Sequence, residues 1–402
     1  MIISFTLISL ILSPFAMVYF FRTEPESNKI CYRRTPFNDI IINACRVLHD
    51  VYRVPAMLRN GILHTFVTYF RRSPPESELV TVPMDVTADD GTILRLDWFI
   101  TEDQPERTMP TILMLHGLNG SASASYIKWM VWAAHRVGYQ CCGLNNRGCG
   151  ESVLKTPKGF NAAFTGDVNN TVDFIRSGDI IDPETPLFII GFSLGAGILI
   201  KYLADNGERL ISKVNGCVAL CASFNMHTSC KSIETPLSVK KHIINRVLAK
   251  GLVGYARRHE KVLKTAEHLD LQRVYKSVTV RQFDSSFVVP LHGFRDIKHY
   301  YDECSTDTRL HLVQVPLLCI NAADDPICPA HGVPVDAFNE NENLFLTVVP
   351  TGGHVAFMHD WFDLSHSWME SASLEFIEAI HHNADRKEVS LSGLSEVMNA
   401  AE

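Results

Sequence analysis

Residues 187–197 of the chain read LFIIGFSLGAG, an apolar run that ends in a serine flanked by glycines. The run at 187–190 has the character of a strand, and residues 198–204 continue at helical spacing. A sharp turn between the two would hold Ser193 above a sheet, while Gly191 and Gly195 would let the strand and the helix approach closely. The Gly-x-Ser-x-Gly pattern is short, so its interpretation depends on the surrounding sequence.

Similar apolar runs recur along the chain and predict a mostly parallel β-sheet. Runs that are apolar on both faces are typical of buried parallel strands, and they lie at 111–115, 139–144, 187–190, 217–220, 316–320 and 344–349. Helix-period segments such as 126–137 and 162–176 alternate with them, which indicates an α/β fold with helices on both faces of the sheet. Strands at 79–86 and 92–99, joined by the turn Asp89-Asp90-Gly91, predict an antiparallel start.

The residues that follow each parallel strand are candidates for a site, because ligands bind beyond the carboxyl ends of such strands. The run at 111–115 is followed by His116-Gly117-Leu118-Asn119-Gly120. Acyl transfer needs backbone N–H donors directed at the developing oxyanion, and we expect the amides of Leu118 and Leu194 to supply them. Gly117 permits the unusual backbone of this loop, and His116 is interpreted as a residue that stabilises it.

A base and an acid are expected after two later strands. A serine hydroxyl becomes a good nucleophile only when a histidine removes its proton and a carboxylate orients that histidine. Residues 352–354 read GGH, and residues 321–327 read NAADDPI. The chain order Ser, Asp, His after successive strands predicts a catalytic triad of Ser193, Asp325 and His354. Asp325 is favoured over Asp324 by its spacing to the apolar residue and the proline that follow. Asp324 is then interpreted as a turn residue that caps its own loop.

Other polar residues receive a structural interpretation. Arg147 lies in the loop after the run at 139–144, with substrate contact as the alternative, and Cys149 is interpreted as a small buried residue. The His331–Asp336 spacing is associated with acyltransferases, but it is too short a pattern to decide the function and it precedes His354. No Cys or His spacing resembles a zinc site, so neither a metal nor a cofactor is expected.

The composition excludes several classes of protein. The chain has 402 residues, of which 46% are apolar and 20% are charged, as in globular proteins rather than disordered ones. With 44 acidic and 37 basic residues its net charge is −7, which argues against a nucleic-acid partner. Eleven scattered cysteines do not indicate a disulfide scaffold.

The first 21 residues predict a membrane anchor. They carry no charged side chain, and about 20 apolar residues at 1.5 Å each span the hydrocarbon core of a bilayer. A cleaved signal peptide is the alternative, but it would need basic residues before the apolar run; a buried core helix is the third. Basic residues follow the run from Arg22 onward and none precedes it, which by the positive-inside rule places the bulk of the chain in the cytoplasm. The sequon at Asn119 is interpreted as a chance match, since a glycan there would crowd the predicted site.

Two further segments complete the expected organisation. Residues 22–78 predict a connector with helices at 40–52 and 56–70, separated by Pro55. About 90 residues between Cys221 and Pro316 are too many for a simple crossover and predict a helical cap over the site. The expected domains are therefore an anchor at 1–21, the connector at 22–78, a domain at 79–385 interrupted by a cap at about 222–312, and a polar tail at 386–402.

The predicted cap contains an apolar helical stripe and a basic segment. Ile243, Ile244, Val247, Leu248 and Leu252 form the stripe. Nine Lys or Arg and two Glu lie between Lys231 and Lys264, a local charge of +7 in an acidic chain. This segment is interpreted either as a solvated helix face or as a lid that faces anionic lipid headgroups.

As a set, these motifs resemble the membrane-anchored branch of the α/β-hydrolase-domain lipid esterases over about residues 55–380. The segments that carry the resemblance are NGILHT at 60–65, HGL at 116–118, NNRG at 145–148, the serine turn, NAADDP at 321–326 and GGHVAF at 352–357. Members of this family include phospholipases, monoacylglycerol lipases and medium-chain ester synthases or hydrolases. The resemblance implies that Asp325 is the acid. It also implies a catalytic domain on the non-cytoplasmic side, opposite to the side that the flanking charges favour. His64 stands where glutamine is common and Ala356 where glycine is common.

The leading hypothesis is a membrane-tethered serine hydrolase that cleaves lipid esters, either phospholipids or acylglycerols, through an acyl-enzyme. The expected partners are a lipid ester and a membrane, without nucleic acid, and the sequence does not indicate an oligomeric state. An alcohol acyltransferase and a non-catalytic receptor or scaffold on the same fold are the alternatives.

Overall fold

A computed structural model describes residues 27–54, 58–74, 80–100, 105–235, 240–360 and 363–383. The predicted anchor at 1–21, the break at Pro55 and the tail at 386–402 lie outside these residues. Within the described ranges, no helix combines the length and the apolar character needed to cross a bilayer.

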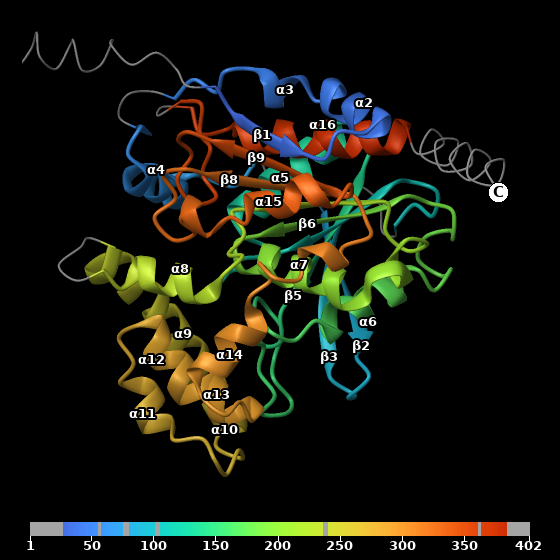
Figure 1. Ribbon diagram of the computed structural model, residues 1–402. Helices are drawn as coiled ribbons and strands as arrows, with labels where there is room; N and C mark the ends of the chain where they lie inside the picture. The colour runs from blue at the N-terminus through green and yellow to red at the C-terminus, as the bar shows by residue number, and fades with distance from the viewer. Residues whose placement is uncertain are drawn as a thin grey trace, which may run out of the picture.

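The described residues form one nine-stranded sheet in the order β1-β9-β8-β7-β6-β4-β5-β3-β2 (Figure 1). Strands β4 to β9 run parallel, β3 pairs antiparallel with both β5 and β2, and β1 pairs antiparallel with β9. The strands are β1 Lys29–Tyr32, β2 Val80–Thr87, β3 Ile93–Ile100, β4 Thr111–Leu115, β5 Gln140–Asn145, β6 Leu187–Phe192, β7 Gly216–Leu220, β8 Leu317–Ala322 and β9 Leu344–Val349. The predicted α/β fold, with a mostly parallel sheet and an antiparallel start, is confirmed.

Successive side chains of the parallel strands point to opposite faces of the sheet, and both faces are covered. Ile112, Phe188 and Phe345 face one hydrophobic core, whereas Leu113 and Ile189 face another. Helices α2 Pro36–Ala44, α3 Arg46–His49, α5 Ser125–Arg136 and α16 Trp368–His382 pack on the first face. Helices α6 Gly166–Ile175, α7 Leu194–Asn206 and α15 Val335–Glu340 pack on the second. This burial explains why the strands read as continuous apolar runs.

Strand β1 was not expected from the sequence, which indicated only helices in this region. Residues 29–32 pair with residues 345–348 of β9 and so extend the sheet at its edge. The four residues KICY show no strand pattern of their own, and their pairing depends on the exposed edge of β9. Helices α2 and α3 replace the single helix predicted at 40–52. Helix α4 Gly61–Val67 and the 3-10 turn η2 Thr68–Phe70 replace the helix predicted at 56–70.

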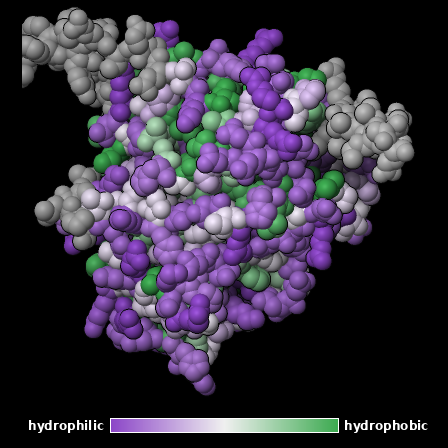
Figure 2. All heavy atoms as spheres, in the orientation of Figure 1, coloured by the Kyte–Doolittle hydropathy of each residue, from purple (hydrophilic) through white to green (hydrophobic). Residues whose placement is uncertain are grey.

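The part of the chain that connects β7 to β8 forms a layer of helices, which lies below the sheet in Figure 1. Its elements are α8 Met226–Ile233, the π-helix η5 Lys240–Asn245, α9 Arg246–Arg258, α10 Glu260–Leu263, α11 Leu271–Tyr275, α12 Val280–Phe283, the π-helix η6 Asp284–Val288, α13 Val289–His292 and α14 Ile297–Cys304. They enclose a third hydrophobic core around Phe283, Phe287 and Tyr301. We call this layer the cap. Figure 2 shows that its surface on the side turned to the viewer is largely hydrophilic.

The cap is attached to the loop that follows β5. Tyr255 Oη donates to the carbonyl of Arg147 at 2.9 Å, and His259 Nε2 contacts the carbonyl of Gly148 at 2.8 Å. The guanidinium of Arg147 is buried and pairs with Asp167 through two bonds of 2.8 and 2.6 Å, and with Asp90 at 2.7 Å. Arg147 therefore ties α6 to the β2–β3 turn and supports the loop on which the cap rests.

Candidate active site

Ser193 occupies the sharp turn between β6 and α7. Its backbone has φ 53° and ψ −114°, in the left-handed half of conformational space that a non-glycine residue rarely adopts. Only glycine fits at the two neighbouring positions. A Cβ on Gly191 would lie 2.6 Å from the carbonyl oxygen of Gly195, and a Cβ on Gly195 would lie 2.2 Å from the carbonyl oxygen of Leu115. Strand, turn and helix are thus packed backbone against backbone, and strain of this kind is typical of functional sites.

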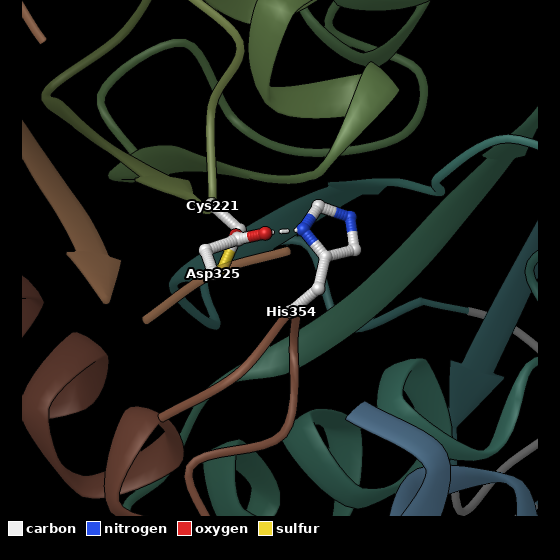
Figure 3. Close-up of side chains that lie close together, drawn as sticks. All are labelled: Cys221, Asp325 and His354. Atoms are coloured by element: carbon white, nitrogen blue, oxygen red, sulfur yellow. Dashed lines mark hydrogen bonds and ion pairs between the residues drawn. The ribbon is translucent and has the colours of Figure 1, made fainter. Parts of the chain in front are cut away.

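The structure brings Ser193, His354 and Asp325 into one hydrogen-bonded row. Ser193 Oγ lies 2.7 Å from His354 Nε2, and His354 Nδ1 lies 2.8 Å from Asp325 Oδ2. The second contact is drawn in Figure 3. With its Nδ1 proton donated to the carboxylate, the imidazole presents a free lone pair at Nε2 to the serine hydroxyl. The geometry is that of a nucleophile, a base and an acid in series; the catalytic roles themselves stay a prediction.

Asp325 is the better placed of the two adjacent acids. Its side chain is fully buried, and its other oxygen, Oδ1, accepts from the amides of Ile327 at 2.7 Å and Cys328 at 2.9 Å. Hydrogen bonds of this kind stabilise the charged form of a buried carboxyl. Both oxygens therefore have donors, one of which is His354.

Asp324 has a different role from Asp325. Its Oδ1 accepts from the amides of Gly352 and Gly353, each at 2.9 Å, so it holds the loop that carries His354. Within the described residues its Oδ2 is buried without a partner, and burial raises the pKa of this carboxyl. The interpretation of Asp324 as a cap of its own loop missed these two bonds across to another loop.

The loop that carries His354 is unusually constrained. Gly353, Val355 and Phe357 all have φ between 50° and 60°, and such backbone needs support from its surroundings. Part of that support comes from α4, about 290 residues earlier in the chain. Thr65 Oγ1 accepts from the His354 amide at 2.8 Å, and His64 Nε2 accepts from the Met358 amide at 2.8 Å. Burial lowers the pKa of His64 to about 4, which keeps its ring neutral as this acceptor role requires.

Cys221 lies beside Asp325 (Figure 3). Its Sγ accepts from the Val355 amide at 3.2 Å, and ligand atoms of Cys221, Asp325 and His354 all lie within 4.8 Å of one another. A thiol must lose its proton to bind a metal, and burial raises the pKa of Cys221 well above its usual range. The Asp325 oxygens already have N–H donors. The chemistry of the three groups therefore fits a buried brace behind the Asp–His pair better than a metal site.

The loop after β4 packs against Ser193, since a Cβ on Gly117 would lie 3.2 Å from the Cβ of the serine. The amides of Leu118 and Leu194 border the same cavity as Ser193, and among the described residues neither has a hydrogen-bond partner. A tetrahedral oxyanion requires two such N–H donors, and the assignment of this role to Leu118 and Leu194 stays a prediction.

His116, Gly117 and Tyr126 hold that loop in shape. His116 Nε2 accepts from the Asn146 amide at 3.1 Å, which leaves Nδ1 to donate to the Gly117 carbonyl at 2.8 Å. Burial lowers the pKa of His116 to about 4, so the ring is neutral in both contacts. The hydroxyl of Tyr126 accepts from the Gly117 amide at 2.9 Å. On the outer side, Asn119 Nδ2 donates to the carbonyl of Leu248 in the cap at 2.9 Å.

Ser193 opens onto a cavity of about 570 Å³ between the sheet and the cap. The walls away from the serine are mainly apolar, with side chains of Met226, Ile233, Leu248, Val280, Ile327 and Val355. A second cavity of about 70 Å³ lies deeper in the cap and shares Leu118, Leu194 and Tyr301 with the first. Asp284 lines it, accepts from the Tyr301 hydroxyl at 2.9 Å, and has its pKa raised by burial to about 7. A space of this size and character accommodates acyl chains.

The sequence indicated the residues at strand ends and the support of one loop by His116, but it did not indicate the supporting contacts of Thr65, His64, Tyr126 and Cys221. Thr65 and His64 belong to the NGILHT segment, which carried the family resemblance without a role. Tyr126 and Cys221 carry no sequence signal, because their contacts arise only from the packing of α5 and β7. The only sign of a supporting role for His64 and Thr65 was that two adjacent polar residues lie in a short, otherwise mainly apolar helix.

Comparisons with known proteins agree with the fold. A family model described as the alpha/beta hydrolase fold matches residues 110–360. Phospholipase ABHD3 of Mus musculus is 29% identical over 352 residues, which cover 86% of this chain and 82% of that protein. Monoacylglycerol lipase of Saccharomyces cerevisiae is 27% identical, covering 78% of this chain and 68% of that protein. Among solved structures, the Pyrococcus furiosus esterase Pf2001 has a TM-score of 0.50 at 17% identity over 76% of this chain and 94% of that one.

Proposed function

Because the chain belongs to the α/β-hydrolase fold family, we propose that it is a serine hydrolase that cleaves the carboxylic ester bonds of lipids. The single observation that carries the proposal is the row of contacts from Ser193 through His354 to Asp325, at 2.7 and 2.8 Å. A row in this order makes a serine hydroxyl nucleophilic at neutral pH.

The reaction proceeds in two halves. In the first, Ser193 Oγ bonds to the ester carbonyl carbon while its proton passes to His354 Nε2. The amides of Leu118 and Leu194 donate to the oxyanion, and the Asp325 carboxylate stabilises the imidazolium. His354 then gives the proton to the leaving alkoxide, and the C–O bond breaks to leave an acyl-enzyme and an alcohol.

In the second half, water takes the place of the alcohol. His354 removes a proton from the water as its oxygen bonds to the acyl carbon, and returns that proton to Ser193 Oγ as the acyl–enzyme bond breaks. The products are a carboxylic acid and free enzyme, so atoms and charge balance without a cofactor.

A lipid ester is the substrate class that the cavity favours. About 570 Å³ of mainly apolar space beside the serine accommodates acyl chains better than a small polar ester. The relatives named phospholipase and monoacylglycerol lipase support the same class. The apolar, uncharged residues 1–21 are proposed as the membrane anchor that keeps the enzyme near such substrates. In this proposal residues 79–385 are the catalytic domain, with the cap at about 222–312.

The test is labelling of the full chain with a fluorophosphonate probe, followed by lipid assays. We expect labelling of the native protein and none of the Ser193→Ala variant; absent labelling, or labelling that survives the substitution, rejects the proposal. Release of fatty acid from phospholipids and monoacylglycerols then identifies the headgroup. The same assay with a medium-chain alcohol present measures acyl transfer, the alternative reaction.

A further inference from the structure

Four large apolar side chains are exposed on helices that line the cavity or directly adjoin a helix that does. Leu63 of α4 is 51% exposed and Phe70 of η2 is 76% exposed; Ile243 of η5 and Val247 of α9 are each 44% exposed. Thr65 and Thr68 line the cavity from the first pair of elements, and Val247 and Leu248 line it from α9. The two groups therefore flank one opening. Figure 1 shows α4, α8 and α9 along the same side of the molecule, at the left of the view.

Helix α4 exposes Leu63 because its other side is occupied. His64 and Thr65 are buried against the His354 loop, and a Cβ on Gly61 would lie 1.9 Å from the carbonyl of Asp324. The polar side chains of His64 and Thr65 are thus buried together with Val67, while Leu63 is exposed. Together with the three other exposed side chains, Leu63 forms apolar surface that nothing in the described chain covers, and such surface marks an interaction site.

The charge around the opening is positive. Arg59 and Arg72 flank α4 and η2, while Arg246 and Lys250 lie on the exposed face of α9, and all four are exposed. Residues 58–74 and 240–258 contain no Asp or Glu. Basic residues around apolar side chains are the pattern of segments that bind the surface of a bilayer with anionic lipids.

The beginning of the described chain is linked to α4 by a short series of hydrogen bonds. Asn28 Nδ2 donates to the carbonyls of Leu48 and Asp50. Two residues further on, Tyr52 Oη donates to the carbonyl of Met358, whose amide donates to His64 in α4. Only five residues separate the proposed anchor at 1–21 from Ser27, a span of at most about 20 Å when fully extended. An anchor in the bilayer would keep this side of the molecule near the membrane.

We propose that Leu63, Phe70, Ile243 and Val247, with the four flanking basic residues, form a docking surface that places the cavity mouth on a bilayer containing anionic lipid. A lipid ester then passes from the leaflet into the cavity without crossing water. This inference rests on the proposed lipid hydrolase function and adds the orientation in which the enzyme meets its substrate.

The test uses the full chain reconstituted in phosphatidylcholine vesicles with or without phosphatidylserine. Two docking substitutions, Phe70→Ser and Ile243→Ser, are combined, since neither side chain lines the cavity. The control is Ile211→Ser, which removes a side chain that is 61% exposed just before β7, on the side of the amino ends of the parallel strands and so away from the site. We expect the double variant to lose at least about fivefold of its activity on vesicle lipid, because apolar contact drives such docking, and to keep its activity on a monomeric short-chain ester. The control should keep both.

Docking is also measured without catalysis. A tryptophan placed by Phe70→Trp should be quenched by brominated lipid in the vesicles, more strongly when phosphatidylserine is present, whereas one placed by Ile211→Trp should not. Unchanged vesicle activity of the double variant, or equal quenching of the two tryptophans, overturns the inference. If the native protein hydrolyses no ester, the proposed function fails, and the quenching experiment still decides whether the surface docks.

Discussion

The Thr65 hydroxyl accepts a hydrogen bond from the backbone amide of His354 at 2.8 Å, and donates one to the carbonyl of Gly61 at 2.6 Å. A single side chain in α4 therefore links the N-terminal part of the chain to the loop that carries the candidate base. Because this loop contains several residues with positive φ, its position depends on contacts of this kind.

Replacing Thr65 by valine should slow catalysis without weakening substrate binding. The substitution keeps the shape of the side chain but leaves the His354 amide without its acceptor, which costs about 1–3 kcal/mol and allows the imidazole to leave its position beside Ser193. We expect kcat to fall about tenfold while KM changes little. The Thr65→Ser variant, which retains the hydroxyl, should recover most of the rate. Equal activity of the two variants, at equal melting temperature, would show that the bond does not position the base.

The two adjacent acids should separate clearly in mutant kinetics. Asp325→Asn removes the carboxylate that orients and stabilises the His354 ring, and kcat should fall about 1,000- to 10,000-fold. Asp324→Asn keeps an oxygen that accepts from Gly352 and Gly353, so its loss should stay within about tenfold. Steady-state assays of both variants on one soluble ester decide the matter. A larger loss of kcat in Asp324→Asn than in Asp325→Asn would show that Asp324, not Asp325, is the catalytic acid.

Residues that can be predicted from the sequence are placed by a local pattern, whereas residues that are missed are placed by contacts with distant parts of the chain. A buried parallel strand must be apolar on both faces, so β4 and β9 are recognisable along their whole length, and the polar residues that follow them are recognisable as site residues. Strand β1 depends on the edge of β9, and its four residues carry no pattern. Thr65 and Asp324 act on a loop far away in the chain, and nothing in their neighbours specifies that contact.

The cap illustrates the same limit in another way. Helical periodicity predicted the stripe of apolar residues from Ile243 to Leu252, and helical structure is indeed present there. Ile244 and Leu252 are buried, but Ile243 and Val247 are exposed. Periodicity gives the apolar residues of a helix but not the partner that covers each of them.

Gly61 should be intolerant of a side chain, since a Cβ there would lie 1.9 Å from the Asp324 carbonyl. Because the obstacle is backbone, α4 or the acid loop would have to move, which costs about 1–3 kcal/mol. Gly61→Ala should therefore lower both the melting temperature and the rate of fluorophosphonate labelling. Gly254 of α9 is the matched control, because no atom lies within 4 Å of its Cβ position and alanine favours a helix by about 1 kcal/mol. A Gly61→Ala protein as stable and reactive as the Gly254→Ala protein would contradict the close packing of α4 against the acid loop.

Asp284 should make the stability of the protein depend on pH between about pH 4 and about pH 7. Burial raises the pKa of its carboxyl from 3.8 to about 7. A raised pKa in the folded state means that the neutral form favours folding: this contribution is fully present below the unfolded value and is lost as pH rises through the folded value. A pKa difference of one unit corresponds to about 1.4 kcal/mol, so the loss of stability amounts to a few kcal/mol at most.

Asp284→Asn keeps an acceptor for the Tyr301 hydroxyl and cannot ionise. Its free energy of unfolding, measured by denaturant at about pH 5 and about pH 8, should therefore fall less between the two than that of the native protein. An equal fall in both proteins would show that Asp284 does not titrate in this range.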